Sequence, residues 1–272
     1  MSARHDPLVN AKLTGYGRPG FGARYDASRP RPPEALVPVL LKLAGTERPG
    51  LVVDLGSGTG LSTALWAERA REVIGIEPLD EMRRIAEETQ RAPNVRFQAG
   101  VAQSTGIPSG AAEVVTCAQS LHHMEPEGTL TEVERILRPG GVFAAYDYDV
   151  PPVVDRDAEE AFFAFMDRVL ALRRRHEIKS DQQRWKKEEH IARLERRGFR
   201  YTRELLLHQS EPCTAERWVG FALTIGLVPP VLDLGLSDDD LGLTAFRRAA
   251  ERAFAGRALP WHVSYRVRVA IK

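Results

Sequence analysis

A glycine-rich loop directly after a short apolar run is the feature that most constrains how this chain folds. Residues 51–55 are Leu-Val-Val-Asp-Leu, and residues 56–60 are Gly-Ser-Gly-Thr-Gly. An apolar run of this length, ended by glycines, is typical of a strand buried on both faces. Glycine allows a tight turn and lets a ligand approach the backbone closely. The sequence therefore predicts a ligand site at the carboxyl end of a buried strand, as in open α/β sheets.

Strands and helices are predicted to alternate around and after this loop. Apolar runs predict strands at 51–55, 72–76, 95–98, 113–118 and 142–146, and amphipathic patterns predict helices at 34–44, 62–71, 81–91 and 128–137. Strands separated by helices form βαβ units, which place parallel strands in one sheet with helices on both faces. The expected fold class is therefore α/β.

The pattern changes after Tyr148. Helices are predicted at 158–176 and 187–197, the second ended by Gly198 as a C-cap. A candidate strand follows at 201–208, then a helical insertion at 212–256 and a closing antiparallel strand at 262–271. The first 33 residues are rich in Gly, Pro and Arg, which predicts turns and loops. We expect one α/β domain in three segments: an N-terminal lid segment at 1–33, a cofactor-binding core at 34–150, and 151–272, which completes the core with its last two strands and adds helical cap insertions.

The spacing of the glycines distinguishes two classes of cofactor. The dinucleotide fingerprint is G-x-G-x-x-G, with a helix N-terminus facing a pyrophosphate, whereas Gly56, Gly58 and Gly60 follow the spacing G-x-G-x-G after Asp54. An acid before the loop would repel a pyrophosphate but would help to hold a cationic group. Glu77, at the end of the second predicted strand, can accept hydrogen bonds from both hydroxyls of a ribose. The pattern therefore favours S-adenosylmethionine (SAM), which carries an ammonium and a sulfonium, over NAD.

Two segments, residues 53–60 and 73–78, resemble the first two signatures of class I SAM-dependent methyltransferases. The similarity continues through residues 99–108, 114–124 and 137–141, and residues 21–25 with Arg29-Pro30 are similar too. These segments resemble the small-molecule branch that includes the ubiquinone/menaquinone-biosynthesis and trans-aconitate methyltransferases. The resemblance implies a Rossmann-like, seven-stranded sheet that is mostly parallel with its last strand antiparallel.

The resemblance also implies which residues bind SAM. It assigns the glycines and Asp54 to the methionyl end, Glu77 to the ribose, Pro78 and Met82 to the adenine, and Gln119 to the methionine side. The branch often has Asp at the position of Val101, bonding the adenine amino group, so adenine recognition here is expected to rest on backbone groups or on Gln103. The complete predicted set is Tyr25, Asp54, Gly56, Ser57, Gly58, Thr59, Gly60, Glu77, Pro78, Met82, Gly100, Val101, Ala102 and Gln119.

His122 and His123 are the candidate catalytic residues, because they follow the fourth predicted strand, where a substrate would meet the methyl group. A neutral histidine can remove a proton from a hydroxyl, an amine or an acidic carbon. The alternative is that the two side chains only shape the pocket or donate a hydrogen bond, since methyl transfer needs mainly alignment. No metal site is expected, because adjacent histidines point different ways and no third ligand is evident. Tyr16, Phe21 and Tyr25 are candidates for a lid over SAM, where aromatic rings attract a sulfonium.

Composition bears on the partner. The 38 Lys and Arg residues against 37 Asp and Glu give a net charge of +1, which argues against a dedicated nucleic-acid binder. Two cysteines cannot form a disulfide framework, and we find neither a signal peptide nor the run of about 18 apolar residues that a membrane span needs. We expect a cytoplasmic methyltransferase acting on a small organic molecule, without nucleic acid or membrane. An RNA methyltransferase and a SAM-binding protein that transfers no methyl group stay open.

Overall fold

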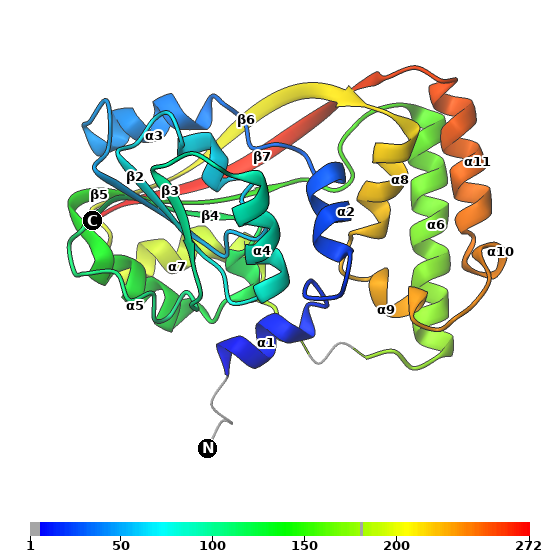
Figure 1. Ribbon diagram of the computed structural model, residues 1–272, viewed down its shortest axis with the longest axis horizontal. Helices are drawn as coiled ribbons and strands as arrows, with labels where there is room; N and C mark the ends of the chain where they lie inside the picture. The colour runs from blue at the N-terminus through cyan, green and yellow to red at the C-terminus, as the bar shows by residue number, and fades with distance from the viewer. Residues whose placement is uncertain (1–5, 180–181) are drawn as a thin grey trace.

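The computed structural model describes residues 6–179 and 182–272 and contains a seven-stranded sheet (Figure 1). The strands lie in the order β3-β2-β1-β4-β5-β7-β6. Strands β1 to β5 are mutually parallel, whereas β7 runs antiparallel to both of its neighbours, β5 and β6. The predicted α/β class and the antiparallel last strand are therefore confirmed. The bounds are β1 Leu51–Leu55, β2 Glu72–Ile76, β3 Val95–Gln98, β4 Ala112–Ala118, β5 Leu137–Tyr148, β6 Tyr201–Cys213 and β7 Leu259–Ile271.

The two faces of the sheet are covered by different helices. Alternate residues of a strand point to opposite faces: Val52 packs in one cluster with helix α3 (Leu36–Ala44), and Val53 packs in another with α5 (Pro126–Ile136) and α7 (His190–Arg197). Helix α4 (Asp80–Thr89) packs beside β3. Both faces of β1 are thus buried, which is why its sequence is apolar on both faces, apart from Asp54, rather than alternating.

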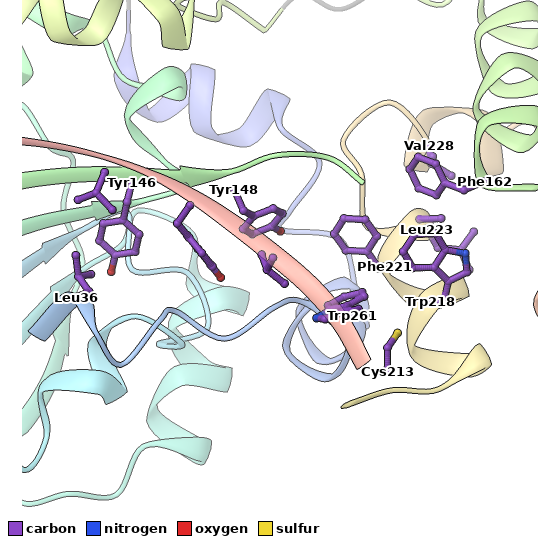
Figure 2. Packing of buried hydrophobic residues seen from close by; sticks show 14 of the residues in the cluster. Leu36, Tyr146, Tyr148, Phe162, Cys213, Trp218, Phe221, Leu223, Val228 and Trp261 are labelled. Atoms are coloured by element: carbon purple, nitrogen blue, oxygen red, sulfur yellow. The ribbon is translucent and has the colours of Figure 1, made fainter. Parts of the chain in front are cut away.

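Helices gather at one end of the sheet, beside the ends of β6 and β7 (Figure 1). They are α6 (Arg156–Arg175), α8 (Ala215–Leu223), α9 (Pro229–Leu232), α10 (Asp238–Leu241) and α11 (Leu243–Phe254). Aromatic rings join this group to the sheet: the Trp261 ring of β7 lies 5.4 Å from that of Phe221 and 6.1 Å from that of Trp218 (Figure 2). The start of the predicted insertion at 212–256 belongs to β6, which ends at Cys213, and the rest contains the four helices α8 to α11.

Two regions differ from the sequence-based expectation. The predicted loops before residue 33 contain helices α1 (Pro7–Leu13) and α2 (Phe21–Ser28), while residues 1–5 lie outside the described residues. Asp6 makes α1 possible, because its carboxylate caps the backbone N–H groups of Leu8 and Val9. The helix predicted at 62–71 is only a short 3₁₀ turn, η1 (Thr63–Trp66). The Ser62 and Thr63 hydroxyls there bond the buried carboxylate of Asp54, which ties the start of this segment to β1.

Candidate functional site

The glycine loop folds back onto the end of the neighbouring strand. The backbone N–H groups of Gly56 and Ser57 both donate to the carbonyl oxygen of Ile76, at 2.8 and 3.1 Å. Gly56 has φ +66°, and a Cβ at this position would lie 2.6 Å from Cε of Met124. Only glycine therefore allows this turn and the close approach of the segment that follows β4.

Asp54 stabilises the loop from beneath. Its side chain is fully buried, and its carboxylate accepts hydrogen bonds from the hydroxyls of Thr63 and Thr116 at 2.7 Å and from that of Ser62 at 3.4 Å. Burial raises the pKa of Asp54 to about 6, against the opposing effect of the three hydroxyls. The carboxylate thus connects β1, η1 and β4 rather than facing a cavity.

Glu77 directly follows the carboxyl end of β2 and also bonds the glycine loop. Its carboxylate accepts from the backbone N–H groups of Gly58 and Leu79, each at 3.0 Å. Burial raises the pKa of Glu77 to about 7, and these two hydrogen bonds oppose the rise. Glu77 lines a cavity of about 720 Å³, so its remaining lone pairs are available to a ligand with hydroxyl donors.

This first cavity brings together most of the residues predicted to hold a nucleoside. Its walls include the apolar side chains of Met82 and Val101, the backbone of the glycine loop, and Gln103, whose Nε2 has no partner among the described residues. Residues of α1 and the segment after it complete the wall. The sequence-predicted residues in it are Tyr25, Gly56, Gly58, Glu77, Pro78, Met82, Val101, Ala102, Gln119 and His123.

A second cavity of about 480 Å³ adjoins the first and shares Tyr25, Gly56, Gly58, Ala118 and Gln119 with it. Predicted residues Ser57 and Thr59 line it, and their buried hydroxyls have no partner among the described residues.

Arg29 supplies the charge of the second cavity. Its guanidinium is buried and donates to the Thr224 hydroxyl at 3.0 Å, the Thr224 carbonyl at 2.5 Å and the Tyr148 hydroxyl at 2.5 Å. It lies 4.6 Å from the centre of the Tyr25 ring. No carboxylate of the described residues lies within ion-pair distance of it. Because three of its five N–H groups are used, the cavity offers a buried cation with donors to spare.

The two histidines are in different environments. His123 lines the first cavity, and its Nδ1 lies 2.6 Å from the amide Nε2 of Gln182. His122 lines neither cavity, and its Nδ1 lies 3.4 Å from the buried carboxylate of Asp147. Burial is the main cause that lowers the pKa of both, and for His123 the neighbouring His122 and nearby Arg184 lower it further. Both imidazoles are therefore neutral at neutral pH.

Four residues of the predicted set do not reach either cavity: Asp54, Gly60, Gly100 and His122. Gly60 is needed for packing, because a Cβ there would lie 2.9 Å from the Phe97 ring. His122 instead joins a buried ion cluster with Asp147, Lys187 and Arg268. His122, one of the two candidate bases, therefore lies outside both cavities.

Sequence reasoning missed Arg29 as a site residue, together with Gln182, Arg184 and Lys187. The sequence analysis named Arg29 only as part of a segment that resembles the methyltransferase family. Nothing in the sequence shows that Arg29 lacks an acidic partner. The other three come from the segment between α6 and α7. Asn10 of α1 secures this segment: its side chain bonds the carbonyl groups of His123 and Gln183 at 2.8 and 3.0 Å.

Comparison with known proteins identifies the domain that contains this site. A family described as "Methyltransferase domain" matches residues 53–145. The Bacillus subtilis uncharacterized methyltransferase YcgJ is 30% identical over 123 residues, which cover 43% of this chain and 49% of that protein. The Saccharomyces cerevisiae probable SAM-dependent methyltransferase CRG1 is 34% identical over 138 residues, or 49% of this chain and 47% of that protein. The chain thus spans about half the length of these relatives.

Two solved structures are similar to most of the length of this chain. A structure from Anaeromyxobacter dehalogenans, described as a candidate type II methyltransferase, is 25% identical with a TM-score of 0.66, covering 89% of this chain and 97% of that one. The structure of YcgJ from Bacillus subtilis covers 88% of this chain and 99% of its own, at 20% identity and a TM-score of 0.53, and shows the fold alone. In the part of the chain that the structure describes, no helix is long and apolar enough to cross a membrane.

Proposed function

Because residues 53–145 form a class I SAM-dependent methyltransferase domain, we propose that this chain transfers the methyl group of SAM to a small organic molecule. One observation carries the proposal: two adjoining cavities meet over the glycine loop, and their polar groups are complementary to the two ends of SAM. Glu77 in the first cavity suits the ribose hydroxyls. Arg29 in the second cavity suits the methionyl carboxylate, with the free hydroxyls of Ser57 and Thr59 beside it.

When bound, SAM supplies a methyl group on a sulfonium, which a nucleophile can displace. The residues of this chain bind and orient the partners of that displacement, and alignment accounts for much of the rate of such a reaction. Gln119 lines both cavities and therefore lies where the nucleoside and methionyl ends meet. The segment of α1 and α2 contributes Pro7, Tyr16 and Tyr25 to the walls and, we propose, excludes water as a lid.

The near-neutral charge of the chain favours a small acceptor over RNA. The test is incubation with methyl-labelled SAM and either a small-molecule extract or total RNA. We expect enzyme-dependent label in the small-molecule fraction only. Label in RNA that is lost as salt rises would favour an RNA methyltransferase. Binding of SAM with no label in either fraction would favour a SAM-binding protein without transferase activity.

The pH dependence of nucleoside binding is expected to follow Glu77. The ionised carboxylate accepts both ribose hydroxyls better than the acid, so binding lowers the Glu77 pKa from about 7 and releases a proton. Affinity for 5′-methylthioadenosine, which keeps the ribose but lacks the titratable amino-acid tail, should rise about tenfold from pH 6 to pH 8. Calorimetric titration measures this. A profile of the same slope in Glu77→Gln would show that another group titrates.

Removal of the Arg29 cation is expected to weaken binding of the methionyl end alone. In Arg29→Met, affinity for S-adenosylhomocysteine should fall about 10- to 100-fold, because a buried charge-assisted hydrogen bond is lost. Affinity for 5′-methylthioadenosine, which has no carboxylate, should stay within about twofold. Arg31→Met is the matched control, since the Arg31 side chain is 49% exposed. Equal losses for the two ligands would mean that Arg29 supports the fold rather than the carboxylate.

A further inference from the structure

The orientation of the Gln182 amide determines which nitrogen of His123 carries the proton. Arg184 Nε donates to Gln182 Oε1 at 2.9 Å, so that oxygen faces away from His123. The Gln182 Nε2 group therefore donates to His123 Nδ1, 2.6 Å away. A neutral imidazole whose Nδ1 accepts a hydrogen bond carries its proton on Nε2. Arg184 and Gln182 thus fix His123 as an Nε2–H donor.

The Nε2–H group of His123 has no acceptor among the described residues, although it is buried and its ring lines the first cavity. Gln119 is arranged in the same way. Lys187 Nζ donates to its Oε1 at 3.1 Å, which leaves a buried Nε2 amide group without a partner in the described part of the chain. The Gln119 backbone is held at φ +52°, with its N–H donating to the Tyr146 carbonyl at 2.9 Å. Gln103 supplies a third unpaired donor in this cavity, which we expect to face the adenine. Because an unpaired buried donor costs free energy, the other two indicate a ligand that accepts from both.

The charge around this pair favours an anionic ligand. Arg184 and Lys187, which orient the two side chains, are both cations, and Lys187 is paired with Asp147 at 2.8 Å. No acidic partner of Arg184 lies within ion-pair distance among the described residues. Under the proposed function, the methionyl carboxylate of SAM pairs with Arg29, which lines the second cavity. The donors that remain are therefore available to the methyl acceptor.

We propose that His123 and Gln119 form a fixed pair of N–H donors that binds an anionic oxygen of the methyl acceptor, a carboxylate. Gln182 and Arg184 are positioning residues, which act by setting the His123 tautomer. His123 is then not the general base, because its Nδ1 lone pair is occupied and its Nε2 already carries a proton. A carboxylate acceptor arrives ionised at neutral pH, which removes the need for a base. This inference rests on the proposed function, since it names the class of the acceptor.

The tautomer of His123 is tested by nitrogen NMR of the protein labelled at its seven histidines, with the His123 signals assigned by their loss in His123→Phe. At pH 7 we expect a neutral ring protonated at Nε2. In Gln182→Glu, the carboxylate must accept from Nδ1–H, so the tautomer should reverse or the ring should become protonated. Gln183→Glu places the same charge on the next, exposed residue and should change nothing. A wild-type ring protonated at Nδ1, or at both nitrogens, overturns the proposal even if Gln182→Glu does not fold.

The anion site is tested with acetate, the smallest stable carboxylate probe, on protein saturated with S-adenosylhomocysteine. We expect saturable shifts of the His123 Nε2 and Gln119 amide signals, with acetate affinity about tenfold weaker in Gln182→Glu and unchanged in Gln183→Glu. If these signals do not shift at a 100-fold excess of acetate over the protein, the proposed anion site is wrong. If the acetate shifts appear with 5′-methylthioadenosine but not with S-adenosylhomocysteine, the donors bind the cofactor carboxylate, which overturns the assignment to the acceptor.

Neither readout depends on methyl transfer. Failure of the proposed function would appear as absence of label or of SAM binding, with the His123 tautomer still at Nε2. Failure of the present inference would appear as the wrong tautomer or an absent acetate response in a protein that still binds and uses SAM.

Discussion

Asp147→Ala is expected to lower the free energy of unfolding by about 3–5 kcal/mol, because it leaves buried cations without their acceptor. The Asp147 side chain lies between three groups: Lys187 Nζ at 2.8 Å, Arg268 at 3.1 Å and His122 at 3.4 Å. Only 4% of the Arg268 side chain is exposed, and its remaining acidic partner is the partly exposed Glu204. Urea unfolding measures the loss.

Asp149→Ala is the matched control for this change. Asp147 lies in β5, and Asp149 directly follows that strand. Asp149 pairs with Arg266 at 3.3 Å, but both side chains are about half exposed. Exposed pairs contribute about 0–1 kcal/mol. Burial alone would raise the pKa of Asp147, but His122 and Lys187 outweigh it and hold that pKa below the usual value of 3.8. The stabilisation is therefore present above about pH 4 and is lost on acidification. Equal losses in the two variants would show that the buried cluster adds nothing.

Glu77→Gln is expected to weaken binding of S-adenosylhomocysteine about 100-fold at pH 8. The amide can accept from only one ribose hydroxyl and has no charge, so one of two charge-assisted hydrogen bonds is lost and the other is weakened. In the free protein, Gly58 N–H and Leu79 N–H each donate to one of the two Glu77 carboxylate oxygens. The same change therefore leaves one of these two N–H groups without its acceptor. Calorimetric titration gives the ratio of dissociation constants.

Glu72→Gln provides the control on the same strand. Glu72 begins β2, and its side chain is 47% exposed and pairs with exposed Arg96. Its removal should change the dissociation constant by less than about twofold. If Glu77→Gln also stays within twofold, the ribose does not bind at the end of β2, and the assignment of the first cavity to the nucleoside is wrong.

The sheet and the cofactor loop were predictable because each depends on a local pattern. The apolar run at 51–55 is buried on both faces of the sheet, as its composition indicates. The glycine at 56 is required by a positive φ that can be anticipated from the turn. The helix predicted at 62–71 was wrong. Ser62 and Thr63 in this segment bond to Asp54, a contact between residues eight and nine positions apart that no periodicity reports.

The site was predictable only in part, because several of its properties depend on distant segments. The directions of the His123 ring and the Gln119 amide are set by residues 59 and 68 positions further along the chain. Arg29 matters because no acid pairs with it among the described residues, which is a property of the fold. Sequence reasoning can name the residue types near a strand end, but hydrogen-bond partners decide whether a histidine there is a donor or a base.

The most direct test of the account is a crystal structure of the protein with S-adenosylhomocysteine. We expect the adenosine in the first cavity with both ribose hydroxyls about 2.7 Å from the Glu77 carboxylate, and the methionyl carboxylate in the second cavity against Arg29. Adenosine bound elsewhere, or a ribose that makes no hydrogen bond to Glu77, would contradict it.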